Sequence, residues 1–243
     1  YRIFGNKHEI LKCIPKDLNP NCFEINHTEE KVIGTDSPLG GAKRGKNTSM
    51  WLSIESVKEK KSDVVISAGN TGALLVIAKL NLKMIENIDK PALSALWPNK
   101  KGMSVVLDLG ANIECNDKNL IDFSLMGSSL FKSLFPDQTP KVALLNIGSE
   151  ELKGNEIIKD TYQKLNQINN DDFEFKGFIE GNHLMDGEVN VIVADGFTGN
   201  IALKTAEGTA NFITDELKKT MTASFTGKIS SLINIKNLKN FKK

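Results

Sequence analysis

The sequence predicts an α/β fold in which helices flank a mostly parallel β-sheet. Three observations support this prediction: short apolar runs of strand length recur along the 243 residues, stretches with helical periodicity separate them, and a turn rich in glycine and asparagine follows most of the runs. Strands that alternate with helices are typical of parallel sheets with both faces covered. The four predicted strands are residues 63–67, 104–108, 142–146 and 189–193.

Each predicted strand leads through a turn into a helical stretch, so one unit is repeated along the chain. The last turn, Ala194-Asp-Gly-Phe-Thr-Gly-Asn200, joins its strand directly to the longest helix. The predicted helices, in chain order, are residues 73–78, 119–135, 155–168 and 199–221.

The composition is that of an ordinary globular protein, with 40% hydrophobic and 25% charged residues. The longest apolar runs are about six residues, such as 73–78, whereas a membrane-spanning helix needs roughly 18 or more. We therefore expect no membrane span. The first residues, Tyr1–Gly5, contain neither a starting Met nor a signal-peptide pattern, so we expect the chain to begin inside a longer protein.

The cysteines and histidines do not form a metal-binding pattern. Cys13, Cys22 and Cys115 lack CxxC spacing, and the three histidines do not cluster with them. We expect no metal site and no cofactor, and unpaired thiols suit a reducing cytoplasm.

The C-terminal segment differs in charge from the rest of the chain. No acidic residue follows Glu216, but seven lysines do, although the whole chain has a net charge of only +1. Apolar residues recur every three or four positions among these lysines, which predicts a basic amphipathic helix. They are Phe225, Ile229, Leu232, Ile235, Leu238 and Phe241.

We accordingly divide the chain into an α/β domain, residues 1–221, and a basic helical segment, residues 222–243. The segment either packs on a second copy of the chain or contacts an anionic membrane or acidic protein, and both can hold at once. Nucleic acid is disfavoured, because the segment has no arginine and the remainder of the chain is acidic.

Small and neutral polar residues gather where the predicted strands end. In an open parallel sheet ligands bind beyond the carboxyl ends of the strands. Glycines there allow backbone N–H groups to approach an anion, and asparagine amides donate and accept hydrogen bonds. The sequence therefore predicts a site for an anionic, carbonyl-bearing ligand. Its residues are Ser67, Gly69, Asn70, Thr71, Gly72, Asp108, Gly110, Asn112, Asn146, Gly148, Gly154, Asn155, Asp195, Gly196, Gly199 and Asn200.

One cation lies inside this pattern. Lys153 precedes Gly154 and the predicted start of a helix, where its charge would add to an anion site. An ordinary surface lysine is the alternative interpretation.

Familiar nucleotide and nucleophile signatures do not fit. Residues 40–47 nearly spell a phosphate loop, but Asn47 replaces the Ser or Thr that binds magnesium, and no apolar strand precedes Gly40. The cations Lys43, Arg44 and Lys46 belong either to a solvated loop or to a phosphate contact. Ser67 is not in a GxSxG turn, so we expect chemistry without a covalent enzyme intermediate.

Several of these motifs together resemble the bacterial phosphate acyltransferase family of phospholipid synthesis. The resemblance rests on Ile66-Ser-Ala-Gly-Asn-Thr-Gly-Ala73, Leu107-Asp-Leu-Gly-Ala-Asn112, Leu145-Asn-Ile-Gly148 with Lys153-Gly-Asn-Glu156, and Asp195-Gly-Phe-Thr-Gly-Asn200. Ser37-Pro38, Lys46-Asn-Thr-Ser-Met50, Met126-Gly127 and Leu203-Lys-Thr205 also match, so it covers nearly the whole chain. The family's N-terminal strand with an Asp-Ala-Met-Gly-Gly-Asp type turn and its glycine-rich C-terminal segment are absent.

The resemblance implies transfer of a fatty acyl group from acyl carrier protein to inorganic phosphate. It also implies a Rossmann-like fold similar to phosphate acetyltransferases and isopropylmalate dehydrogenases, a homodimer, and a cytoplasmic protein that can attach to the inner membrane face. Lys153 and Asn200 match active-site positions of the family. The alternatives are a phosphate acetyltransferase-like enzyme that uses coenzyme A, and a non-catalytic module that docks on acyl carrier protein or membrane.

Overall fold

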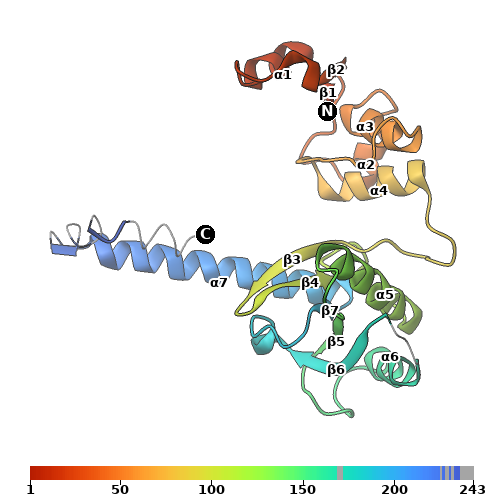
Figure 1. Ribbon diagram of the computed structural model, residues 1–243, viewed down its shortest axis with the longest axis vertical. Helices are drawn as coiled ribbons and strands as arrows, with labels where there is room; N and C mark the ends of the chain where they lie inside the picture. Colours follow the sequence, from red (N-terminus) through yellow and green to blue (C-terminus); the bar gives the residue numbers. More distant parts are fainter. Residues whose placement is uncertain (169–171, 225, 228–229, 231–232, 236–243) are drawn as a thin grey trace. The chain divides into compact units, whose positions relative to one another are not determined.

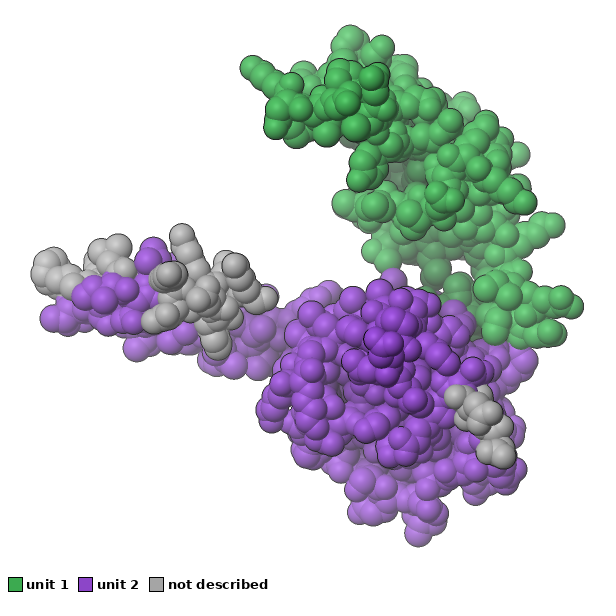
Figure 2. Space-filling view, in the orientation of Figure 1, with its two compact units in different colours: residues 1–92 green, residues 93–243 purple. Residues whose placement is uncertain are grey.

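The computed structural model describes residues 1–168, 172–224, 226–227, 230 and 233–235. The chain divides into two compact units, Tyr1–Ala92 and Leu93–Lys243, drawn in two colours in Figure 2. The boundary falls inside the range that we predict as one α/β domain.

Unit 1 combines a small sheet with a group of helices (Figure 1). Its two strands, β1 (Arg2–Gly5) and β2 (Glu24–His27), pair in parallel. Its core lies between α3 and α4 and consists of Met50, Ile54, Ala73 and Ile77. The helices of unit 1 are α1 (Lys7–Cys13), η1 (Pro20–Cys22), α2 (Pro38–Lys43), α3 (Ser49–Lys58) and α4 (Thr71–Leu82).

The prediction of a strand at residues 63–67 is wrong. The segment forms no sheet ladder with any described strand, and the side chains of Val64 and Ile66 are 71% and 87% exposed. An apolar β-branched run predicts a strand only if a neighbour satisfies its backbone. The following helix is confirmed as α4, longer than predicted at both ends.

Unit 2 is built on a five-stranded sheet with the order β3-β4-β7-β5-β6 (Figure 1). β4, β7, β5 and β6 run parallel to one another, and only β3 is antiparallel. The mostly parallel sheet of the prediction is therefore confirmed here. The strands are β3 (Ser94–Asn99), β4 (Gly102–Leu107), β5 (Lys141–Asn146), β6 (Glu174–Glu180) and β7 (Val191–Val193).

Helices and loops cover this sheet on both faces. α5 packs on β4 and β7, and α6 on β5 and β6. On the opposite face Val106, Ala143 and Ile192 form a core with the first turns of α7, through Ala202 and Leu203. The helices of unit 2 are α5 (Asp117–Leu134), α6 (Glu156–Gln167), η2 (Gly181–His183) and α7 (Gly196–Thr222).

The second half of α7 leaves the sheet. Residues 207–220 are all exposed, including Phe212, Ile213 and Leu217. Of the predicted amphipathic helix beyond it, only Ile235 among the six apolar positions falls within the described residues, and the other five lie outside them. No described helix has the length and apolar character needed to cross a membrane.

Candidate functional site

Three predicted site loops begin side by side at one edge of the unit 2 sheet. Val193 of β7 pairs with Leu107 of β4 on one side and with Leu144 of β5 on the other. Asp108, Asp195 and Asn146 follow these paired residues by one or two positions. The carboxyl ends of parallel strands therefore collect these loops as the sequence predicts.

Asp108 organises the loop that follows β4. Its buried carboxylate accepts hydrogen bonds from the N–H groups of Gly110 (3.1 Å), Ala111 (2.9 Å) and Asn112 (2.7 Å), and from Leu93 (3.0 Å). The Asn112 amide also donates to it, at 2.7 Å. We expected these N–H groups to face an anionic ligand, but they donate to the protein's own carboxylate instead, so this expectation is corrected.

Replacement of Asp108 by Asn tests this role. An amide keeps one oxygen acceptor but places an NH₂ group opposite the Asn112 donors, so we expect a loss of about 2 kcal/mol in the free energy of unfolding. Urea denaturation measures it, with Asp137→Asn, an exposed carboxylate between α5 and β5, as the control. An unchanged midpoint for Asp108→Asn would contradict the assignment.

The two glycines of the β7–α7 turn allow the helix to start against that same loop. The N–H of Gly196 donates to the carbonyl of Asn112 at 2.8 Å, and a Cβ on Gly196 would lie 2.6 Å from that oxygen. A Cβ on Gly199 would overlap the carbonyl oxygen of Asp108. Both glycines are therefore required for close packing of α7 on the loop.

Asp195 caps this helix. Its carboxylate accepts hydrogen bonds from the N–H (2.8 Å) and hydroxyl (2.9 Å) of Thr198. A side-chain acceptor at this position satisfies a backbone donor that the helix itself leaves unpaired. The Asp195 carboxylate therefore stabilises the start of α7.

The β5–α6 loop is held by asparagines. Asn146 accepts a hydrogen bond from the N–H of Ile147 (2.9 Å) and donates to the carbonyl of Lys153 (3.2 Å), which closes the loop on itself. Gly154 has φ +91°, and a Cβ there would lie 2.5 Å from the Asn146 oxygen. Asn155 caps α6 by accepting from the N–H of Ile158, at 2.9 Å.

Lys153 and Asn200 differ from their neighbours, because their polar groups are not used by the fold. Both side chains are exposed, and within the described ranges Lys153 forms no ion pair and the Asn200 amide has no hydrogen-bond partner. Asn200 lies against Gly110, whose added Cβ would be 3.5 Å from the Asn200 side chain. Gly148 approaches the Lys153 side chain, since a Cβ placed on this glycine would lie 3.0 Å from the Lys153 Cγ. These two groups are available to a ligand at the sheet edge.

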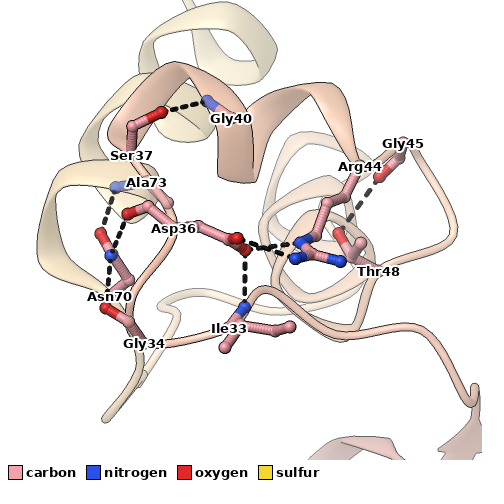
Figure 3. Close-up of polar contacts among 10 residues, drawn as sticks. All are labelled: Ile33, Gly34, Asp36, Ser37, Gly40, Arg44, Gly45, Thr48, Asn70 and Ala73. Carbon is pink, nitrogen blue, oxygen red and sulfur yellow. Dashed lines mark hydrogen bonds and ion pairs between the residues drawn. The ribbon is translucent and has the colours of Figure 1, made fainter.

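The remaining predicted residues belong to unit 1, where Asn70 has a structural role. It caps α4 by accepting from the N–H of Ala73 (2.9 Å), and its amide donates to the carbonyls of Gly34 (3.0 Å) and Asp36 (2.9 Å), as Figure 3 shows. Its side chain therefore ties the start of α4 to the segment before α2.

The other four residues of this set lie around the same helix start. The hydroxyl of Ser67 accepts from the N–H of Gly69 at 3.2 Å, Thr71 begins α4, and a Cβ on Gly72 would lie 2.6 Å from the Pro38 ring. The arrangement is a tight turn into a helix, and within unit 1 it brings all five predicted residues together.

Unit 1 also holds a cavity of about 920 Å³ that the sequence did not reveal. It lies among β1, α3 and the extended segment 61–69, and Ser67 and Gly69 line it. The cavity depends on how distant segments meet, so no local motif could have predicted it.

The sequence of residues 40–47 nearly matches a phosphate-loop motif, but the segment does not fold as a nucleotide-binding loop. Residues 38–43 form the short helix α2, capped by Ser37, rather than a loop before a helix. The guanidinium of Arg44 donates two hydrogen bonds to Asp36, one of them 2.8 Å long (Figure 3). Of the three cations in this stretch, Arg44 is therefore paired within the protein.

This pair makes the stability of unit 1 sensitive to acid. Hydrogen bonds from Arg44, and next from the N–H of Ile33, hold the pKa of Asp36 below its usual 3.8. A carboxyl whose pKa is lower in the folded state stabilises the fold above its unfolded pKa, and the contribution is lost as the pH falls through the folded pKa. We therefore expect this contribution to decrease as the pH falls below about 4.

Arg44→Gln is the matching test. We expect the pKa of Asp36 to rise toward its usual value and the acid sensitivity of unit 1 to weaken, because the charged donor is gone. A carbon-detected NMR titration of the Asp36 carboxyl measures this directly. If its pKa stays where it is in the parent chain, the pair does not set it.

Comparison with known proteins identifies the family. Residues 1–243 match the family described as "Fatty acid synthesis protein". The chain is 79% identical over 242 residues to the phosphate acyltransferase of Pelagibacter ubique, and the match covers all of this chain and 72% of that protein. It is 44% identical to the phosphate acyltransferase of Maricaulis maris, with 86% and 59% coverage, and 41% identical to that of Neorickettsia sennetsu, with 98% and 70% coverage. The chain thus spans roughly three fifths to three quarters of the length of these relatives.

Two solved phosphotransacetylase structures share this fold. A phosphotransacetylase from Streptococcus pyogenes aligns with a TM-score of 0.60 and 17% identity, and EutD phosphotransacetylase from Staphylococcus aureus with 0.57 and 15%; each alignment covers 86% of this chain and 73% of the other. At such identities the likeness concerns the fold alone. The sequence matches show that the chain belongs to the phosphate acyltransferase family, whose members are acyltransferases.

Proposed function

We propose that the protein transfers a fatty acyl group from acyl carrier protein to inorganic phosphate and releases acyl phosphate for phospholipid synthesis. The observation that carries the proposal is a pair of exposed side chains whose polar groups have no partner among the described residues. They are Lys153, in the loop after β5, and Asn200, near the start of α7 after the neighbouring strand β7. Most of the other polar side chains that we predict at this edge of unit 2 form hydrogen bonds that hold their own loops and helix starts in place.

The reaction needs placement and charge compensation more than strong acid or base. A phosphate oxygen attacks the thioester carbonyl carbon, the new C–O bond forms, and the carbonyl oxygen becomes an oxyanion. The C–S bond then breaks, and the thiolate leaves with the bonding pair and takes a proton from water. Phosphate is a competent nucleophile and a thiolate a good leaving group at neutral pH, so neither step requires a general acid or base.

Lys153 and Asn200 fit two parts of this reaction. We assign the Lys153 ammonium to the oxyanion or the incoming phosphate, and the Asn200 amide to a hydrogen bond with either reactant. Preorganised donors of this kind contribute about 3–4 kcal/mol each to the transition state, and alignment of the reactants as much as roughly 7–11 kcal/mol.

We also propose a homodimer and a cytoplasmic protein that can touch the inner face of the membrane. The exposed apolar side chains in the second half of α7 support a second copy on this helix, because a partner would bury their apolar surface. The basic segment after residue 222 supports contact with an anionic surface.

The first experiment is phosphate-dependent release of free acyl carrier protein from its hexadecanoyl form by the full-length protein. We expect release that requires phosphate and yields hexadecanoyl phosphate. Acetyl coenzyme A as donor is the comparison: faster turnover with it would favour the phosphotransacetylase-like alternative. Binding of the carrier protein with no turnover in either assay would favour a docking module.

A further inference from the structure

Large apolar side chains stand in water next to the predicted site residues of unit 2. Ile147 follows Asn146 directly and is 81% exposed, and Leu152 precedes Lys153 and is 86% exposed. Phe197 is 59% exposed and lies one helical turn before Asn200. Ile201 and Ile113, 52% and 70% exposed, adjoin Asn200 and Asn112 in the same way. We call these five residues the apolar rim.

The rim comes from two loops and the start of α7, which the fold gathers at one edge. Its members follow β4, β5 and β7, which are hydrogen-bonded neighbours in the sheet. Phe197, Asn200 and Ile201 have the spacing of one face of α7. The rim residues Phe197 and Ile201 therefore lie on the same helix face as the amide of Asn200. Isolated exposed apolar residues are ordinary, but several of them beside the predicted site residues of one sheet edge indicate a binding surface.

We propose that the apolar rim binds the acyl chain of the thioester donor and sets the preference for long chains. This inference rests on the proposed function, because the thioester carbon must meet Lys153 and Asn200. A fatty chain attached to that carbon must leave from the same point, and Leu152 adjoins Lys153 while Phe197 lies one helical turn before Asn200.

The charges of the same loops favour an acyl chain over other occupants. Glu150 and Glu151 are exposed beside the rim, and Asp195 is partly exposed. These carboxylates would repel an anionic membrane surface. They leave an uncharged hydrocarbon unaffected.

The test compares hexadecanoyl and butanoyl acyl carrier protein as donors for the full-length protein and for Leu152→Ser and Phe197→Ser. We expect each variant to lose roughly tenfold in kcat/KM with the long-chain donor and less than twofold with the short-chain donor, because burial of a Leu or Phe side chain accounts for such a factor. Leu134→Ser is the control; Leu134 is 46% exposed at the far end of α5, away from this edge, and its replacement should change neither rate.

Other outcomes overturn the inference. Equal losses with both donors would mean that the rim contacts the carrier protein, and no loss with either would leave it without a role in the reaction. A change in sedimentation that accompanies the loss would show a second copy on the rim instead. Circular dichroism checks that each variant is folded.

A binding measurement separates this inference from the proposed function. Without phosphate, we expect the parent protein to bind the hexadecanoyl form of the carrier more tightly than the butanoyl form, and Leu152→Ser to reduce that difference. If the parent protein shows no turnover but still binds the hexadecanoyl form more tightly, the proposed function is wrong and the assignment of the rim to the acyl chain is supported. Turnover with no chain-length preference in either measurement would overturn the rim alone.

Discussion

Lys153→Ala should lower kcat for phosphate-dependent acyl transfer by about 10²–10³-fold, the usual effect of removing one preorganised oxyanion donor. The expected loss is large because no other described cation lies in the same loop to replace it: the acidic Glu150 and Glu151 are the nearest charged residues before it in sequence. Steady-state release of acyl carrier protein at several phosphate concentrations measures the effect.

The kinetic pattern distinguishes two roles for the ammonium. A fall in kcat at unchanged KM for phosphate indicates stabilisation of the transition state, whereas a rise in that KM alone indicates binding of phosphate in the ground state. Lys153→Arg keeps the charge and should retain part of the activity. Lys141→Ala, at the opposite end of β5, should change neither parameter. Full activity and unchanged phosphate affinity in Lys153→Ala would remove Lys153 from the site.

Gly199→Ala should destabilise unit 2 by roughly 3 kcal/mol, at the upper end of what an overpacked methyl group costs. The methyl group would overlap the backbone carbonyl oxygen of Asp108, which cannot rotate away as a side chain can. The helix start and the loop after β4 must therefore separate, and the contact of Asn200 with Gly110 separates with them. We expect activity to fall as well.

Gly208→Ala provides a matched control in the same helix. Nothing lies within 4 Å of a Cβ at Gly208, so this change should stabilise α7 by up to about 1 kcal/mol through helix propensity. Urea unfolding followed by the fluorescence of buried Trp97, in a Trp51→Phe background, reports on unit 2. Equal effects of the two substitutions would show that Gly199 has no special packing role.

Much of unit 2 could be predicted from the sequence, because its strands are buried and apolar. The helices 119–135, 155–168 and 199–221 are confirmed to within a few residues as α5, α6 and α7. β6 was missed, since Glu174-Phe-Lys-Gly-Phe-Ile-Glu180 mixes charged residues with apolar ones at the sheet edge. The segment 63–67 shows the reverse error, an apolar run without a described strand beside it.

The candidate site was predicted in its positions more than in its contacts. The strand ends do collect Asp108, Asn146 and Asp195, as a parallel sheet requires. Sequence could not tell that the Asp108 carboxylate takes the N–H groups of its own loop, because a turn-forming and a ligand-binding Asp look alike in a motif. Only the contacts in the folded chain separate such residues from Lys153 and Asn200, whose assignment to the site stays a prediction.

The exposed half of α7 has a consequence for amide hydrogen exchange. The first turns are fixed by packing of Ala202 and Leu203 on the sheet, whereas residues 207–220 are exposed throughout. An isolated helical stretch of this length is marginal in water, so in a single chain its amides should exchange orders of magnitude faster than those near the sheet. The difference in exchange rate between the two halves of α7 therefore shows whether another surface covers the second half. This measurement needs neither substrate nor substitution.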